Sequence, residues 1–231
     1  MKFYYIFILI VFVSSLANQE RFSDLKERNF KGPVKSITQY RYNPIQNNGN
    51  WEIDTTNIIA ITKYYVNSYG NFTKITKQFL NKKTKSNQTT VFKFEDSKKK
   101  SFVKTDSTGI IEKGTYVWTS DYNYNMTVYG QDNIRTETST QFDKSYRDKS
   151  GSIREFVNDS LTSYYTYNNT LNDNGEIMKT DYNYVHIHAS GSTTYVNKEY
   201  DENNNLTLLT AMNQTSGVLY FSIIREFEYY Q

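Results

Sequence analysis

Apolar and polar residues alternate one by one along most of the chain after residue 30. Successive side chains of a β-strand point to opposite faces, so this alternation predicts strands with one buried and one wet face. In the run 116–128, most even positions are aromatic or aliphatic and most odd ones are Thr, Asp or Asn. The run is either one strand or two strands joined by a turn at Ser120–Asp121. A second run, 221–229, places four apolar residues on one face: Phe221, Ile223, Phe227 and Tyr229. We therefore expect an all-β protein.

Helix-like spacing is confined to residues 19–29, through Phe22 and Leu25. Helices this short are marginal in water unless packing holds them. We therefore expect residues 18–29 to form a linker or a short helix, and residues 30–231 to form a single domain.

The predicted turns resemble one another. Residues 65–72, 146–153 and 200–206 share one order: an aromatic residue, a polar turn, Gly or Asn, a polar residue, and an apolar residue. Residues 171–177 and 106–111 are weaker copies. Gly and Asn tolerate positive φ at a turn, and the flanking apolar residues begin adjacent strands. The five turn residues are 39, 42, 24 and 29 positions apart, which suits a hairpin unit with variable loops: Gly70, Gly109, Gly151, Gly175 and Asn204.

Composition supports strands rather than helices. The chain has 22 Tyr and 14 Phe against two Pro and ten Gly, and aromatic residues are enriched in strands. A mean hydropathy of -0.72 indicates a sheet with much polar surface. The expected architecture is an antiparallel meander of repeated β-hairpins in an open, strongly twisted sheet or half-shell. A two-sheet sandwich or a barrel is the alternative.

The turn units resemble the YD repeats of Rhs-type proteins, whose pattern centres on Tyr-Asp-x-x-Gly-x-Leu. Tyr200-Asp201 followed by Asn204 and Leu206 is the best match. The opening segment 30–37, followed by two tyrosines, also resembles the first strand of uncharacterised exported proteins from Bacteroidetes-like bacteria with such repeats. The resemblance implies a twisted, mostly antiparallel sheet with no catalytic residues to carry over.

Residues 1–17 have the features of a secretory signal peptide. Lys2 is followed by an apolar run from Phe3 to Val13, and Ser15-Leu16-Ala17 supplies a small-x-small cleavage pattern. An uncleaved anchor is the alternative, but the run is shorter than the roughly 20 residues that span a bilayer. The chain contains no Cys, which argues against an N-terminal lipid anchor. We expect an exported protein, periplasmic or at the cell surface, with no transmembrane anchor after cleavage.

Charge gives little pull towards nucleic acid. The formal net charge is +3, and the lysine-rich stretch 82–104 is interrupted by Glu95 and Asp96. A solvated hairpin edge explains that stretch, because exposed lysines also discourage edge-to-edge aggregation. We expect no nucleic-acid partner.

Few residues could carry chemistry. His186 and His188 are the only histidines, and on a strand from Tyr182 they would share one face and offer two nitrogens to a metal ion. A zinc site needs a third and usually a fourth ligand, so the pair is a weak metal candidate. The acidic turn 172–176 lacks the outer ligands of a Ca²⁺ loop. We expect no cofactor, no metal and no enzymatic activity.

Aromatic residues supply the candidate binding surface. Trp51, Trp118, Tyr122 and Tyr124 could form a flat platform for sugar rings or a partner protein. Alternatively, the same side chains fill the buried face of the sheet.

The sequence thus predicts a non-catalytic exported interaction protein whose Tyr-rich sheet binds a carbohydrate or a protein partner. A structural or envelope-assembly scaffold is the alternative, and it would self-associate through exposed strand edges.

Overall fold

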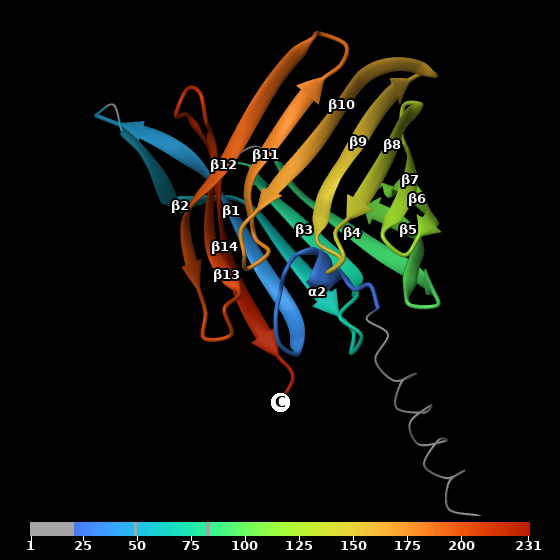
Figure 1. Cartoon of the computed structure of the whole chain (residues 1–231), viewed down its shortest axis with the longest axis horizontal. Helices are drawn as coiled ribbons and strands as arrows, with labels where there is room; N and C mark the ends of the chain where they lie inside the picture. Colours follow the sequence, from blue (N-terminus) through green and yellow to red (C-terminus); the bar gives the residue numbers. More distant parts are fainter. Residues whose placement is uncertain (1–20, 49, 82–83) are drawn as a thin grey trace, which may run out of the picture.

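The computed structural model describes residues 21–48, 50–81 and 84–231 (Figure 1). The predicted leader, residues 1–17, lies outside the described residues, so its cleavage stays a prediction. The described chain forms a closed barrel in which every strand is antiparallel to its neighbours. Its strands are β1 (Val34–Asn47), β2 (Asn50–Val66), β3 (Phe72–Asn81), β4 (Thr84–Glu95), β5 (Lys98–Asp106), β6 (Gly109–Ser120), β7 (Asn123–Gly130), β8 (Ile134–Phe142), β9 (Asp148–Val157), β10 (Ser160–Leu171), β11 (Ile177–Tyr184), β12 (Ala189–Tyr200), β13 (Leu206–Asn213) and β14 (Leu219–Tyr229).

Pairing of the first strand with the last closes the barrel. β1 pairs with β2 on one side and with β14 on the other, and its register with β14 runs from Val34 opposite Tyr229 to Tyr42 opposite Ser222. The prediction of an all-β antiparallel meander of hairpins is therefore confirmed. The open half-shell is wrong, and the barrel, the alternative reading, is the observed form. Closure satisfies the backbone groups that an open sheet would leave unpaired at two edges.

Residues 21–33, named here the plug, lie at one end of the barrel and pack against its inner face (Figure 1). The plug contains one helical turn, α2 (Asp24–Glu27), whose first residues are capped by the Ser23 hydroxyl, which accepts the Lys26 N–H at 3.3 Å. Among the described residues, no helix is long and apolar enough to cross a membrane.

The plug is held by apolar contacts on opposite sides. Phe22 lies 4.8 Å from the Trp118 ring and 5.4 Å from the Phe142 ring. Leu25 packs in a separate cluster with Ile37 and Phe72. These partners come from strands on opposite sides of the barrel. The plug, which includes the helix-like segment of the sequence, therefore lies inside the lumen.

Four five-residue turns at the plug end share one hydrogen-bond pattern. In each, the side chain of the first residue accepts the N–H of the fifth at 2.8 to 3.0 Å, and the fourth has positive φ. These turns are Asn67–Asn71, Asp143–Arg147, Asn172–Glu176 and Asp201–Asn205. The last three begin at positions 143, 172 and 201. Their spacing of 29 residues is the length of one unit of two strands and their turns.

One predicted turn was placed wrongly. The expected unit 146–153 put its turn glycine at Gly151, but that residue lies within β9. The turn instead occupies 143–147, and Tyr146 itself takes the positive φ, 63°. The error arose because Gly was assumed to mark a turn. Gly151 is needed for close approach, since a Cβ there would come within 2.2 Å of the Ser139 carbonyl oxygen.

The inward face of the barrel is aromatic along one wall. Rings on β4 to β8 form a continuous series of contacts with centroids 5.3 to 6.2 Å apart: Phe92, Phe102, Tyr116, Tyr124 and Phe142. The immediate neighbours of each of these residues along its strand point outwards, because strand side chains alternate.

The outward face is mostly polar from β3 to β12. Its apolar exceptions include Val91, Val117 and Tyr129, with exposed fractions of 50, 61 and 58%, and also Val103, opposite Val91, and Phe156, opposite Arg135. Cross-strand neighbours on this face are mostly Thr, Ser, Asn, Lys, Glu and Gln, among them Thr76–Thr89, Thr115–Thr127, Asn125–Ser139, Gln141–Ser150, Ser152–Thr166 and Asn183–Ser190.

Candidate binding cavity inside the barrel

A cavity of about 330 Å³ lies between the plug and the wall formed by β9 to β14. Its wall on β13 and β14 is apolar and includes Leu209, Phe221 and Ile223. Its lining includes charged side chains from several elements: Glu27 and Arg28 on the plug, Arg147 and Asp148 at the start of β9, Glu176 in the β10–β11 turn, and Arg225 on β14. The volume falls in the range of roughly 300–1,000 Å³ that is typical of small-molecule pockets.

Arg225 presents a positive charge to this cavity. Its Nε donates to Gln39 Oε1 at 3.1 Å, and its Nη1 donates to the Leu206 carbonyl at 3.2 Å. The guanidinium also lies 5.4 Å from the Phe30 ring. Both hydrogen-bond acceptors are neutral, and no ion pair to Arg225 exists within the described part of the chain. Burial, and after it the charge of Arg28, lower the pKa of Arg225 to about 10.

Arg28 carries the second positive charge. It follows α2 directly, and its guanidinium lies 5.6 Å from the Tyr64 ring and 5.5 Å from the Phe72 ring. The residue is enclosed by the barrel wall yet is exposed to the lumen. Considering described residues only, its side chain makes no hydrogen bond. Arg28 is therefore a cation held over aromatic rings.

Asp148 is a carboxyl of the cavity whose pKa is raised. Burial, and after it the charge of Glu27, raise the pKa of Asp148 to about 7. The Tyr167 hydroxyl donates to its two oxygens at 3.1 and 3.2 Å, which opposes that rise. Asp148 is consequently about half protonated near pH 7.

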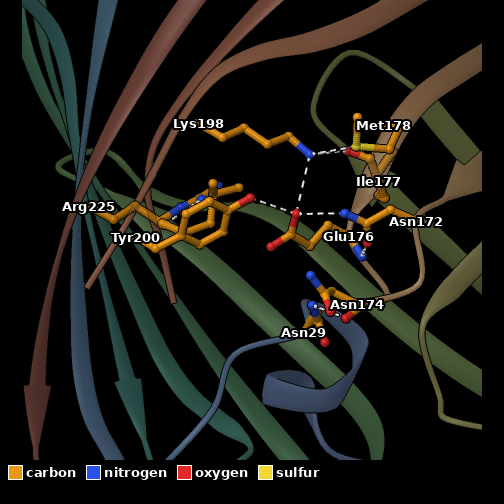
Figure 2. A network of polar contacts seen from close by, with 10 residues as sticks. Asn29, Asn172, Asn174, Glu176, Ile177, Met178, Lys198, Tyr200 and Arg225 are labelled. Carbon is orange, nitrogen blue, oxygen red and sulfur yellow. Dashed lines mark hydrogen bonds and ion pairs between the residues drawn. The ribbon is translucent and has the colours of Figure 1, made fainter. Parts of the chain in front are cut away.

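A polar network closes the rim of the cavity at the plug end (Figure 2). Glu176 Oε2 accepts from the Tyr200 hydroxyl at 2.7 Å and from Asn172 Nδ2 at 3.1 Å, and Lys198 Nζ lies 3.5 Å away. Asn29 of the plug donates to the Asn174 carbonyl at 3.0 Å. The β10–β11 turn is thereby tied both to β12 and to the plug.

Lys99 and Asp24 fix the other side of the plug. The Asp24 carboxylate forms an ion pair with Lys99 and accepts the Phe72 N–H at 2.7 Å. Burial lowers the pKa of Lys99, but the charges of Asp24 and Glu27 outweigh burial and raise it above its ordinary value.

The predicted aromatic platform is divided by the structure. Trp118 and Tyr124 point inwards, in ring contact with Phe142, and the Trp118 Nε1 donates to the Lys99 carbonyl at 3.0 Å. Tyr122 stacks on Tyr146, with centroids 5.0 Å apart. Trp51 lies in the β1–β2 hairpin, opposite Gln46, at the other end of the barrel. The four residues therefore do not share one flat face, and ligand binding by any of them stays a prediction.

The two histidines lie in a turn rather than in a strand. β11 ends at Tyr184, and residues 185–188 form the exposed connection to β12, with His188 at a φ of 47°. In the described part of the chain, no group of three or more His, Cys, Asp or Glu residues is placed to hold a metal ion.

Arg225 and Arg28 were not singled out from the sequence, although one signal was present. The apolar face of 221–229 is interrupted only at Arg225, which is a charge at an inward position. Arg28 gave no such signal, because its place in the lumen depends on the plug entering the barrel.

Comparison with solved structures supports the barrel architecture. Over 86% of this chain and 99% of the other, the fold is similar to that of a porin-like protein from Bacteroides vulgatus ATCC 8482, with a TM-score of 0.50 and 13% identity. A porin-like protein from Bacteroides uniformis ATCC 8492 gives a TM-score of 0.45 and 14% identity over 85% of this chain and 97% of the other. No protein-family model and no curated protein matches the sequence.

These findings correct the resemblance to YD repeats of Rhs-type proteins. The similar turns that carried it, such as the one at Tyr200-Asp201, belong to hairpins of a closed barrel rather than to an open repeat sheet. Short turn motifs are shared by unrelated sheets, because tight hairpins favour Asx residues and positions that tolerate positive φ.

Proposed function

We propose that the protein is an exported, non-catalytic binding protein that holds a small ligand inside its barrel, in the cavity between the plug and strands β9 to β14. The cavity itself carries this proposal, because it combines an apolar wall with Arg225, a cation that lacks an ion-pair partner among the described residues. Ligand pockets are mostly apolar with a few placed polar groups.

The two faces of the barrel support a protein that works in water. Transmembrane barrels turn an apolar band towards lipid and a polar face towards the lumen. Here the outward face of β3 to β12 is mostly polar and part of the inward face is aromatic. The plug also occupies the lumen at one end. We therefore favour ligand binding over the formation of an open pore.

Export is supported by the leader-like residues 1–17 and is consistent with the fold of the porin-like proteins. A scaffold that assembles through free strand edges has less support, because β1 and β14 pair with each other.

A glycan is the second candidate ligand. The rings of Tyr165, Tyr182 and Tyr184 form a cluster on the inward face of β10 and β11, with centroids 5.5 to 6.4 Å apart. Sugar rings pack on partly exposed aromatic side chains such as Tyr184, which is 38% exposed.

Thermal unfolding against a panel of glycans and amphipathic small molecules tests the proposal, since a ligand that binds only the folded state raises the midpoint. The expected result is a saturable rise that is lost in Leu209→Trp, which fills the cavity. Val117→Trp, on the outward face, is the matched control and should retain the rise. A rise that Leu209→Trp leaves unchanged would place the ligand elsewhere.

A further inference from the structure

Three observations together restrict what the cavity can bind. The first is the state of Arg225, which sits inside the barrel and uses neutral acceptors for the two hydrogen bonds it makes. A guanidinium has five N–H donors, so donors remain for a ligand. Removing a cation from bulk water without a partner is unfavourable, and an anion bound at this position would relieve that penalty.

The second observation is that the other ion pairs around the cavity are complete. Arg147 pairs with Asp143 at 2.6 Å, and Lys198 lies 3.5 Å from Glu176. Asp24 pairs with Lys99 on the far side of the plug. Arg28 and Arg225 remain as cations that face the cavity, and the Arg28 side chain makes no hydrogen bond among the described residues.

The acids that face these two arginines do not neutralise them fully. Glu27 and Asp148 both line the cavity, and burial is the largest cause that raises the pKa of each carboxyl. Neither forms an ion pair with Arg28 or Arg225 at contact distance in the described chain. Burial lowers the pKa of Arg28, but the charges of Tyr64, Glu27 and Asp24 outweigh burial and raise it, so these groups balance the Arg28 charge only from a distance.

The third observation is the apolar wall. Leu209, Phe221 and Ile223 lie on β13 and β14 next to Arg225, and Leu209 is only 9% exposed. A ligand that both balances the guanidinium charge and covers this wall has an acidic group at one end and hydrocarbon at the other.

We propose, building on the lumen-binding function above, that the cavity takes an amphipathic anion, with its acidic headgroup at Arg225 and Arg28 and its apolar body along β13 and β14. A cation is disfavoured by the two guanidinium groups, and a neutral hydrocarbon would leave them without a partner. Carboxylate and phosphate headgroups share the recognition chemistry, because both accept paired hydrogen bonds from arginine.

Calorimetric titration of the full protein with decanoate, decanol and inorganic phosphate tests this inference. Decanoate is expected to bind at least about tenfold more tightly than decanol, since a hydrogen bond to a charged group contributes more than a neutral one. Inorganic phosphate, which has the charge without the hydrocarbon, is expected to bind more weakly than decanoate. Monodecyl phosphate in place of decanoate shows which headgroup is preferred.

Two variants identify the residues. Arg225→Gln keeps a hydrogen-bond donor for Leu206 but removes the charge, and it should weaken decanoate about tenfold or more while leaving decanol unchanged. Arg28→Gln should have the same selective effect and is the safer variant for folding, because the Arg28 side chain makes no hydrogen bond within the described chain. Arg154→Gln, on the outward face, is the control and should leave both affinities as they are.

The outcomes separate this inference from the broader function. Equal binding of decanoate and decanol, unaffected by Arg225→Gln and Arg28→Gln, would overturn the anion class but leave lumen binding intact. Binding of a glycan, with no binding of decanoate or monodecyl phosphate, would do the same. If Leu209→Trp changes the binding of no compound in the panel, the lumen-binding function falls and the anion class falls with it.

Discussion

The Asp24 carboxylate on the plug accepts the backbone N–H of Phe72, the first residue of β3, at 2.7 Å. The same carboxylate forms an ion pair with Lys99 on β5, and both side chains are largely buried. One plug residue therefore bonds to two barrel strands, and this contact fixes the plug in the lumen beside the cavity.

Removing the Asp24 charge is predicted to destabilise the protein strongly. Asp24→Asn keeps an acceptor for Phe72 but leaves Lys99 buried without its partner, and breaking a buried pair typically costs about 3–5 kcal/mol. Chemical denaturation should show a loss of about 3 kcal/mol. Glu95→Gln breaks the exposed Lys100–Glu95 pair and is the control, with an expected change below about 1 kcal/mol. Equal effects of the two variants would contradict a structural role for Asp24.

Gly114 is predicted to be required by the aromatic wall. A Cβ at Gly114 would lie 2.0 Å from the Phe102 ring, whereas a Cβ at Gly191 would meet nothing within 4 Å. Gly114→Ala must displace a buried ring, at a cost of about 1–3 kcal/mol. Gly191→Ala should leave stability unchanged or raise it slightly, because it reduces the freedom of the unfolded chain. The comparison of the two midpoints in urea checks the prediction, and similar midpoints would refute it.

Asn204 allows a test of the shared turn geometry. It has a φ of 58° in the β12–β13 turn, where the β10–β11 turn has Gly175 at 81°. Asn204→Ala should destabilise the protein by about 1 kcal/mol, because Ala disfavours the left-handed region, and Asn204→Gly should be neutral or slightly stabilising. Glu202→Ala, in the same turn without positive φ, is the control. A higher midpoint of thermal unfolding for Asn204→Ala than for Asn204→Gly would contradict this geometry.

Stability is predicted to depend on pH through Asp148. Its pKa is raised from an ordinary 3.8 to about 7, so the folded state binds the proton more tightly than the unfolded state does. Stability from this group is fully present below about pH 4 and is lost progressively as the pH rises to about 7. Asp148→Asn should remove that loss, and at pH 8 it should be more stable than the wild type by up to about 4 kcal/mol.

Urea unfolding at pH 5 and pH 8 measures this effect. Because Glu27 faces Asp148 and also has a raised pKa, Glu27→Gln is measured alongside to separate the two contributions. A wild-type protein and an Asp148→Asn variant with the same change in stability between pH 5 and pH 8 would show that Asp148 is not the responsible group.

Much of the secondary structure could be predicted from the sequence. The alternation at 116–128 and 221–229 corresponds to β6 with β7 and to β14, with the reversal at Asp121–Tyr122 next to the expected position. The strand predicted through His188 ends instead at Tyr184, because alternation continued into an exposed turn where nothing is buried.

The candidate site was less accessible to sequence reasoning. Trp118 and Tyr124 were predicted either to bind a ligand or to fill the buried face, and alternation alone cannot distinguish the two. Their packing against the plug residue Phe22 makes them part of the interior. Arg225 interrupts an apolar face, but whether such a charge meets a partner depends on strands that are distant in sequence.

The sequence by itself determined local structure in this protein: the strand faces, the hairpins, and the Asx turns at the plug end. These depend on side-chain alternation and on φ preferences, which act between neighbouring residues. Only the tertiary structure decided that β1 meets β14, that residues 21–33 enter the lumen, and that Arg28 and Arg225 face one cavity. Those contacts join residues nearly 200 positions apart, and they form because closure satisfies both sheet edges and burial of the plug removes apolar surface from water.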